Sequence, residues 1–196
     1  MPAHQLTFRN RAREAVRTEV SQVAWRLFAE HGYDATTVDT IALAAGMSRR
    51  TFFRYFHGKD DLVLARMTES GEALLAALRE APAELGAWPA LRTAFQVIVD
   101  RQLANPEWSR RLQSILRDEP TVRATIEEWR RRWTTLLGPA ITDRLPDGGR
   151  IEVRADAIVR SALECLETAQ EAWSREPGED LSALVDEAMG AVAPLA

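Results

Sequence analysis

Apolar residues recur along the chain at the three-to-four-residue spacing of α-helices, and no segment alternates apolar and polar residues between hairpin turns. The first predicted helix covers residues 9–31, where one apolar stripe is formed by Val16, Val20, Val23, Ala24, Leu27 and Phe28. Gly32 follows directly, at the position where a left-handed residue commonly ends a helix. The pattern therefore predicts an all-α protein.

The next apolar stripe is short and lies between two strong helix signals. Thr36 or Thr37 can cap its start, and Gly46 ends it. Ser48 can then cap a third helix that begins at Arg49. Two short helices joined by a turn that starts with glycine are typical of a helix-turn-helix.

Aromatic and basic residues divide between the faces of this third helix. Phe52 and Phe56 are spaced i, i+4 and are expected to face the core made by the first two helices, together with part of Phe53. Arginines and hydroxyl groups remain for the other faces, and periodicity leaves Arg54 between the two sets. The helix is thus expected to be held by its aromatics and to expose its cations.

A long fourth helix is predicted from residues 57–60 to the break at Pro82. It would join a helix-turn-helix domain, residues 1–56, to a larger helical domain, residues 57–196. In the second domain, helices are expected at 89–104, 107–118, 121–144 (kinked or broken at Pro139), 153–174 and 180–192.

Charge is distributed unevenly between these parts. The chain of 196 residues has a formal net charge of -4, yet residues 1–66 hold ten Lys or Arg against seven Asp or Glu, net +3. The rest of the chain is therefore acidic, at -7. A positive segment on an acidic body predicts a polyanionic partner for the first part only.

The residue types on the third helix suit double-stranded DNA. Arg49 and Arg50 stand at its start, and an arginine fork can bind O6 and N7 of guanine in the major groove. Thr51, Tyr55 and Lys59 are spaced i, i+4, i+8 and offer hydroxyl or ammonium donors to phosphate oxygens.

Two further groups are expected to reach the DNA backbone. The amide groups around Thr37 and Ser48, at the starts of the second and third helices, can bind phosphates. Arg9, Arg11, Arg13 and Arg17 crowd the start of the chain, where an arm could reach the backbone or a minor groove.

Residues 20–66 resemble the N-terminal DNA-binding domain of the TetR (tetracycline-repressor-like) family of bacterial regulators. The matching elements are A-x-x-L-F-A-E-x-G-Y, then T-T-V-x-x-I-A-x-x-A-G-M-S, then T-F-F-R-Y-F-x-x-K-x-D-L, in order and without gaps. The resemblance implies that Arg49 and Arg50 read bases and that Thr51, Tyr55 and Lys59 contact phosphates. It also implies that Thr36 or Thr37 marks the phosphate-facing start of the second helix. The family often has Tyr at the position of Phe53, which is expected to pack rather than to contact phosphate.

Members of this family are generally homodimers, in which the last two helices of each subunit form a four-helix interface. Here both final helices carry wide apolar stripes, which would need partners on two sides. The alternative is one thick monomeric core. The predicted interface residues are Ile158, Ala162, Cys165, Leu166, Ala169, Trp173, Leu181, Leu184, Val185, Ala188 and Val192.

The same resemblance implies a small-molecule effector in the larger domain. Large aromatics at helical spacing usually form core, yet a few polar groups among them would suit an apolar pocket. The candidate residues are Phe95, Gln102, Trp108, Leu112, Trp129 and Trp133. Residues 110–133 resemble the ligand domains of actinobacterial members thought to bind acyl-CoA-like compounds, and another apolar compound is the alternative.

The remaining composition narrows the class of protein. Three histidines and one cysteine, Cys165, without a nucleophile triad, phosphate loop or metal motif, argue against an enzyme, a metal site and a cofactor. The sequence has no run of eighteen apolar residues that would predict a membrane span, so we expect a cytoplasmic protein. The overall prediction is a ligand-responsive transcriptional repressor that binds a palindromic operator as a homodimer and is released by a small, largely apolar effector. The alternative is a ligand-independent DNA-binding or architectural helical protein.

Overall fold

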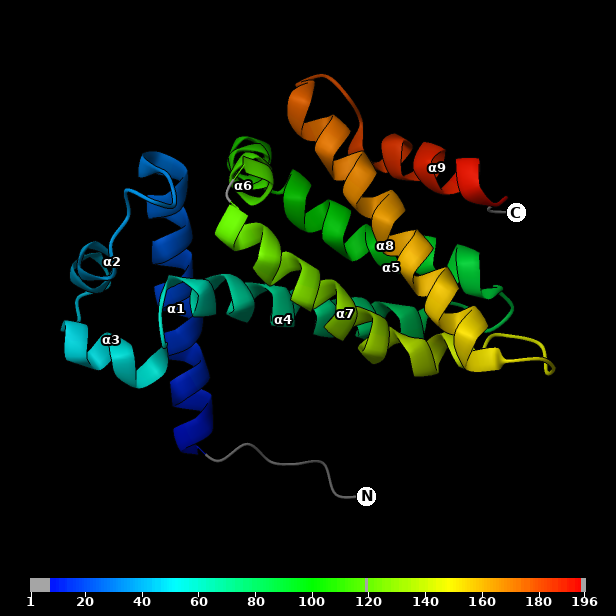
Figure 1. Ribbon diagram of the computed structural model, residues 1–196, viewed down its shortest axis with the longest axis horizontal. Coiled ribbons are helices and arrows are strands. Elements are labelled where there is room, and N and C mark those ends of the chain that lie inside the picture. Colours follow the sequence, from blue (N-terminus) through cyan, green and yellow to red (C-terminus); the bar gives the residue numbers. More distant parts are fainter. Residues whose placement is uncertain (1–7, 119, 195–196) are drawn as a thin grey trace. The chain divides into compact units, whose positions relative to one another are not determined.

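A computed structural model of the chain describes residues 8–118 and 120–194, without the side chains of residues 8–11, 14, 60, 63–67, 108, 115, 116, 118 and 120–126. This part of the chain is all-helical, as predicted (Figure 1). The helices are α1 (Phe8–His31), α2 (Val38–Ala44), α3 (Arg49–Tyr55), α4 (Lys59–Glu80), α5 (Ala87–Leu103), α6 (Pro106–Asp118), α7 (Pro120–Thr142), α8 (Ile151–Arg175) and α9 (Leu181–Val192).

Helix α7 runs through Pro139 to Thr142 and is not broken there. The residue before a proline normally avoids helical geometry because its Cβ clashes with the proline ring. Gly138 has no Cβ, so it removes that clash and lets the helix continue.

The chain forms two compact units, residues 1–68 and 69–196, which divide inside α4. The boundary suggested by the sequence, between residues 56 and 57, marks only the end of the third helix. Lys59, in the first turn of α4, donates a hydrogen bond from Nζ to the Tyr33 carbonyl oxygen at 2.7 Å. The beginning of α4 is thereby bonded to the first unit, and the division comes later in the helix.

Aromatic side chains form the core of the first unit. Phe28 is fully buried and meets Trp25 edge to face, with ring centroids 5.4 Å apart, and it meets Tyr33 at 4.9 Å. Phe52 and Phe56 of α3 are also buried, with centroids 5.2 Å apart. Burying a phenylalanine side chain contributes about 1.5–3 kcal/mol, so these two rings hold the short helix α3 in place.

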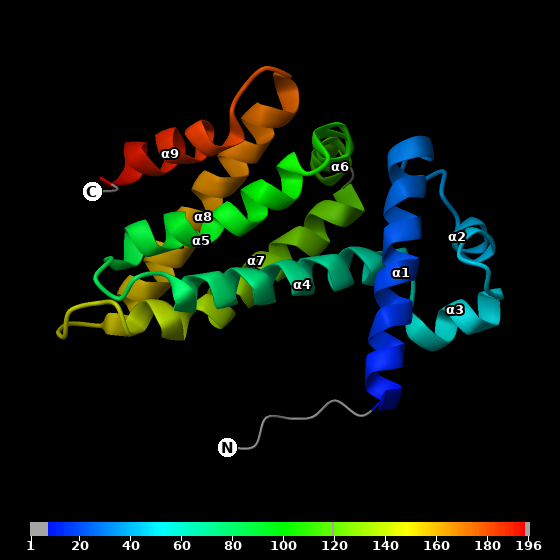
Figure 2. The ribbon, with the colours of Figure 1, turned by 180° about the vertical axis from the view of Figure 1, so that it is seen from behind.

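Helix α8 is central to the second unit, where it packs against α5, α6, α7 and α9. Figures 1 and 2 show it, in orange, with the red helix α9 following beside it. The core contains side chains from α4, α5, α7, α8 and α9, among them Leu74, Phe95, Leu137, Trp173 and Val185.

Most of the residues predicted for a dimer interface lie inside this core. Seven of them are at most 6% exposed in the single chain: Ala162, Cys165, Leu166, Ala169, Trp173, Leu181 and Val185. Ile158, Leu184 and Ala188 are half-buried beside them, and Val192 is exposed. The stripes are wide because α8 and α9 bury them against each other and α5, so assigning the seven buried residues to a dimer contact was wrong.

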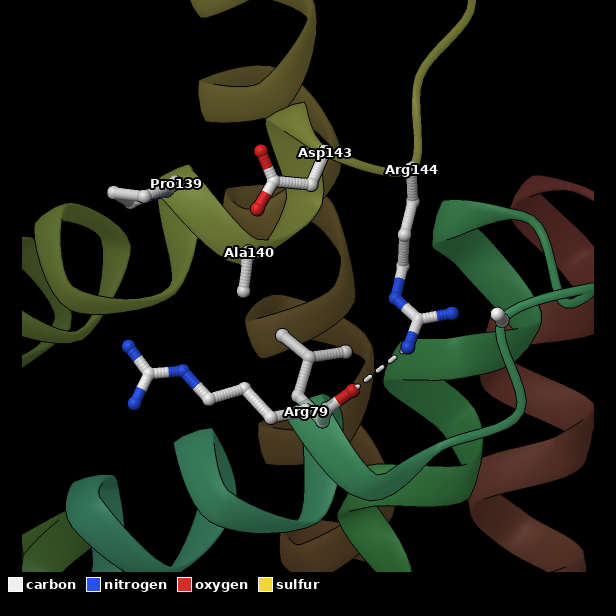
Figure 3. A pocket seen from close by; sticks show the side chains of 7 residues that line it. Arg79, Pro139, Ala140, Asp143 and Arg144 are labelled. Carbon is white, nitrogen blue, oxygen red and sulfur yellow. Dashed lines mark hydrogen bonds between the residues drawn. The ribbon is translucent and has the colours of Figure 1, made fainter.

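A pocket of about 290 Å³ lies in the second unit, between the ends of α4 and α7. Figure 3 shows Arg79 and Asp143 at its sides, with Ala140 between them. Nearby, the Arg144 guanidinium donates hydrogen bonds to four carbonyl oxygens at the end of α4 and after it, those of Leu78 (3.0 Å), Ala81 (2.8 Å), Pro82 (2.8 Å) and Leu85 (3.2 Å). This arginine therefore caps α4.

Candidate nucleic-acid interface

Side-chain caps and one left-handed glycine shape the turn between α2 and α3. The Thr37 hydroxyl accepts a hydrogen bond from the Thr40 amide, and the Ser48 hydroxyl accepts one from the Thr51 amide, both at 3.1 Å. Gly46 adopts φ +66° between the two helices, a conformation that L side chains rarely adopt. The caps and the turn predicted from the sequence are thus confirmed.

The exposed side of α3 carries three arginines and one aromatic ring. Arg49, Arg50, Phe53 and Arg54 are exposed, while Thr51 and Tyr55 are half-buried. Arg54 places its guanidinium 5.2 Å from the centroid of the Tyr55 ring. The helix therefore presents cations on the side opposite its buried phenylalanines.

Arg49 is held by two neighbours. Its Nη1 donates to Oδ2 of Asp39 on α2 at 2.7 Å, and its guanidinium lies 5.6 Å from the centroid of the Phe53 ring. Both members of the ion pair are exposed, at 63% for Arg49 and 60% for Asp39, so solvent screens their attraction.

Two other cations predicted to contact DNA also hold the fold together. Arg17 donates from Nη1 to the Tyr55 carbonyl oxygen, at the end of α3, and lies 4.7 Å from the centroid of the Phe56 ring. Besides its bond to the Tyr33 carbonyl, Lys59 lies 4.3 Å from the centroid of the Tyr33 ring. Arg17 is thus part of α1 and stabilises α3, contrary to its place in a predicted arm.

One prediction at the interface was wrong, and another held only in part. Thr36 is 1% exposed, and its hydroxyl donates to the carbonyl oxygens of Gly32 (2.7 Å) and Leu27 (3.3 Å), so it offers nothing to a phosphate. Part of Phe53 was expected to pack, and its ring does meet the buried Phe52 edge to face, yet 44% of it remains exposed. It lies one residue beyond Phe52, and a step of about 100° along a helix turns it out of the core.

Sequence reasoning also missed Asp39 as a partner of Arg49. The only signal was its acidic side chain near the start of α2, a position that the helix dipole alone would favour. Pairing across the turn depends on the angle between α2 and α3, which the spacing of residues along one helix does not reveal. Of the predicted arm, Arg13 is exposed on α1, while the side chains of Arg9 and Arg11 lie outside the described residues.

The residues predicted for an effector site lie mostly in the core of the second unit. Phe95, Leu112 and Trp129 are at most 9% exposed, and Gln102 and Trp133 are half-buried. The Trp108 side chain lies outside the described residues. Within the described part of the chain, Gln102 Oε1, Trp129 Nε1 and Trp173 Nε1 are buried without a hydrogen-bond partner. None of the six residues predicted for the effector site is among the described residues that line the pocket at Arg79.

Two searches restricted to the described residues bear on other classes of site. They contain no group of three or more His, Cys, Asp or Glu side chains placed to hold a metal ion. None of their helices has the length and hydropathy needed to cross a lipid bilayer.

Two family models match the chain. Residues 22–65 match the model of bacterial regulatory proteins of the tetR family, and residues 85–195 match that of the MftR C-terminal domain. The transcriptional repressor AcnR of Corynebacterium diphtheriae is 31% identical over 159 residues, which cover 78% of this chain and 75% of AcnR. The putative mycofactocin biosynthesis transcriptional regulator MftR of Mycobacterium tuberculosis is 26% identical, with 92% of this chain and 89% of MftR covered. The regulator TcmR of Streptomyces glaucescens is 37% identical over 93 residues, which span only 41% of TcmR.

Solved structures share the fold. FadR from Bacillus subtilis in complex with stearoyl-CoA superposes with a TM-score of 0.66 at 19% identity, covering 91% of this chain and 98% of that one. Thermus thermophilus FadR in complex with lauroyl-CoA gives 0.59 at 23% identity, covering 89% and 91%.

The helix-turn-helix with its cationic face, followed by a larger helical unit, defines a transcriptional regulator. Its relatives are transcriptional regulators and not enzymes. The chain belongs to the TetR family of bacterial regulatory proteins.

Proposed function

We propose that the protein is a ligand-responsive repressor that binds a palindromic operator as a homodimer and is released by a small, largely apolar effector. The observation that carries the proposal is the exposed cationic side of α3, on a helix fixed by the buried rings of Phe52 and Phe56. Two such helices, related by a two-fold axis, would enter successive major grooves about 34 Å apart.

We assign base contacts to Arg49 and Arg50 and phosphate contacts to Thr51, Tyr55 and Lys59, with the starts of α2 and α3 at Thr37 and Ser48 lying on the DNA backbone. Thr36 is left out because its hydroxyl is already bonded inside the unit. Lys59 keeps further ammonium donors beside its bond to Tyr33, since a lysine carries three.

Selection of bound sequences from random duplex DNA tests the operator proposal. Wild-type protein should enrich one palindromic sequence, and Arg50→Ala should relax the preference at one base pair of each half-site. Arg131→Ala, which removes an exposed arginine paired with Glu128 in the second unit, is the matched control and should leave the preference unchanged. If Arg49→Ala and Arg50→Ala both kept the wild-type preference, the base-reading assignment would be wrong.

For the homodimer we propose the outward sides of α8 and α9, in place of their buried stripes. Small or apolar exposed residues there include Val153, Ala157, Ala183, Ala191 and Val192. Stable dimers bury about 1,600 Å² in all, and small residues let helices approach closely enough for that. Sedimentation should give twice the chain mass, and Ala157→Arg with Ala183→Arg should give monomers without loss of helix content. A monomeric wild-type protein would refute this part of the proposal.

For the effector we propose a compound with an apolar chain, held among α5, α7 and α8. Three buried polar atoms on these helices, Gln102 Oε1, Trp129 Nε1 and Trp173 Nε1, have no hydrogen-bond partner within the described part of the chain. Leaving such a group unpaired costs about 1–3 kcal/mol, which a polar group of an effector would offset. The structurally similar FadR proteins were solved with lauroyl-CoA and stearoyl-CoA, which favours an acyl-CoA over other apolar compounds.

Helix α4 offers a route from this site to the DNA-binding unit. Trp133 lies one turn from Trp129 on α7, and its indole packs directly on Gly71 of α4. We propose that an effector beside Trp129 displaces Trp133 and thereby α4, changing the separation of the two α3 helices in the dimer. Such coupling is typically about 1–3 kcal/mol between the two ligands.

Measuring operator affinity with and without acyl-CoAs of graded chain length tests this. We expect release from the operator and a raised melting temperature with one range of chain lengths, both reduced in Trp129→Phe. Mass spectrometry of protein purified from its host provides an independent search for other bound compounds. Operator affinity that no bound compound changes would instead support a ligand-independent DNA-binding protein.

A further inference from the structure

Phe53 is a large apolar ring on the cationic side of α3. Single exposed apolar residues are common on protein surfaces, so its 44% exposure alone says little. Its neighbours make it informative. The ring meets the buried Phe52 edge to face, with centroids 5.6 Å apart and an interplanar angle of 88°, and so it is held at a set angle.

Arg49 lies between this ring and a carboxylate. Its guanidinium is 5.6 Å from the Phe53 centroid, and its Nη1 bonds Asp39 Oδ2 at 2.7 Å. The three side chains come from two helices and meet at the exposed side of α3. An arginine held from both sides has fewer orientations available than a free one. A freely rotating arginine would suit a nonspecific phosphate contact, and Arg49 is not of that kind.

The chemistry of these groups corresponds to two features of the major groove. Guanine alone presents two acceptors, O6 and N7, that a guanidinium fork can bind together, and thymine alone presents a C5-methyl group that an apolar side chain can contact. Phe53 follows Arg49 by four residues, so the two side chains share one side of the helix and would meet neighbouring base pairs.

We propose that Asp39, Arg49 and Phe53 form a reading unit, in which Arg49 binds a guanine and Phe53 contacts the methyl group of an adjacent thymine. Asp39 is a positioning residue that holds the Arg49 fork and, through its negative charge, disfavours a phosphate at the same place. The proposal rests on the operator binding proposed above and adds which bases are read and why.

Modified bases in the selected operator test the reading unit on the wild-type protein itself. Replacing the contacted dT by dU removes only the C5-methyl group and should weaken binding about fourfold, the ratio expected for one buried methyl group. Replacing the adjacent dG by 7-deaza-dG removes one acceptor of the Arg49 pair and should weaken binding about tenfold.

Protein variants then assign each effect to its side chain. In Phe53→Ala the dU substitution should no longer change the affinity, while 7-deaza-dG should still lower it. In Arg49→Ala the 7-deaza-dG substitution should no longer change the affinity, while dU should still lower it. Phe53→Leu keeps an apolar side chain and should restore part of the dU effect. Melting curves of each variant check that the first unit remains folded.

Asp39→Asn separates positioning from simple charge. We expect a smaller penalty for the wrong base at the contacted guanine, together with tighter binding to random DNA and a steeper salt dependence, because a repulsive charge is lost. A merely structural carboxylate would lower affinity for operator and random DNA by the same factor, and that result would remove Asp39 from the reading unit.

The outcomes distinguish this proposal from the one on which it rests. If selection enriches no sequence, operator binding itself is refuted. If an operator is found but every dT tolerates dU in the wild-type protein, or if Phe53→Ala keeps the full dU effect, the reading unit is refuted and operator binding stands.

Discussion

Replacing Gly71 by alanine tests the packing of α4 against α7. Gly71 lies inside α4, where glycine is normally unfavourable by about 0.5–1 kcal/mol relative to alanine. A Cβ built on Gly71 would lie 2.5 Å from Trp133 Nε1, 2.8 Å from Cδ1 and 3.2 Å from Cε2. Two of these distances are below 3.0 Å, closer than real Cβ atoms come to other heavy atoms, and the atoms belong to a rigid ring rather than to the end of a flexible side chain.

Two effects of opposite sign therefore compete. The gain in helix propensity stabilises the variant by about 0.5–1 kcal/mol, while overpacking costs about 1–3 kcal/mol. We expect Gly71→Ala to lower the free energy of unfolding by about 1 kcal/mol. Gly190→Ala in α9 is the matched control, because nothing in the same chain lies within 4 Å of the added Cβ. In the monomeric protein with Ala157→Arg and Ala183→Arg it should raise the free energy of unfolding by about 0.5 kcal/mol.

Urea denaturation followed by far-ultraviolet circular dichroism measures both changes, at one protein concentration and with the oligomeric state of each variant checked. The same pair of measurements in a Trp133→Ala background removes the indole, and Gly71→Ala should then become stabilising. If Gly71→Ala stabilised the protein with Trp133 present, as much as Gly190→Ala does, the close packing and the route from α7 to α4 would both be refuted.

Three other changes probe separate features. Arg144→Ala removes four hydrogen bonds to carbonyl oxygens around the end of α4 and should lower the free energy of unfolding by about 2–3 kcal/mol in urea titrations. The control Arg131→Ala removes an exposed ion pair and should change it by less than about 0.5 kcal/mol. Tyr55→Phe should weaken binding to operator DNA and to random DNA by the same factor, as measured by fluorescence anisotropy. A loss of affinity confined to the operator would contradict a phosphate contact. Burial raises the pKa of the Cys165 thiol, and the Glu164 carboxylate raises it further, so the native state keeps this proton at a pH where the unfolded chain loses it. The free energy of unfolding should therefore fall as pH rises above about 8.5. It should fall less steeply in Cys165→Ala. An identical pH dependence in the variant would contradict the raised pKa of Cys165.

Much of the fold follows from local patterns in the sequence. The helices, the caps at Thr37 and Ser48, the turn at Gly46 and the burial of Phe52 and Phe56 were predictable because each depends on residues within a few positions of one another. The family was recognisable for the same reason, since its motif is one short continuous segment.

Features that depend on contacts between distant segments were not predictable in this way. Periodicity showed that α8 and α9 have wide apolar sides, but only their packing against α5 and each other decided that these sides form the core of one chain. Arg17 was assigned to an arm because charge along the chain carries no information about the Tyr55 carbonyl, 38 residues away.

The composition of the DNA-binding side was thus set by the sequence, and its geometry by the tertiary structure. Arg49, Arg50 and Tyr55 could be identified from residue type and position on one helix. The pairing of Arg49 with Asp39 arises from the angle between α2 and α3. That angle is the result of side-chain packing in three dimensions, which no repeat along a single helix encodes.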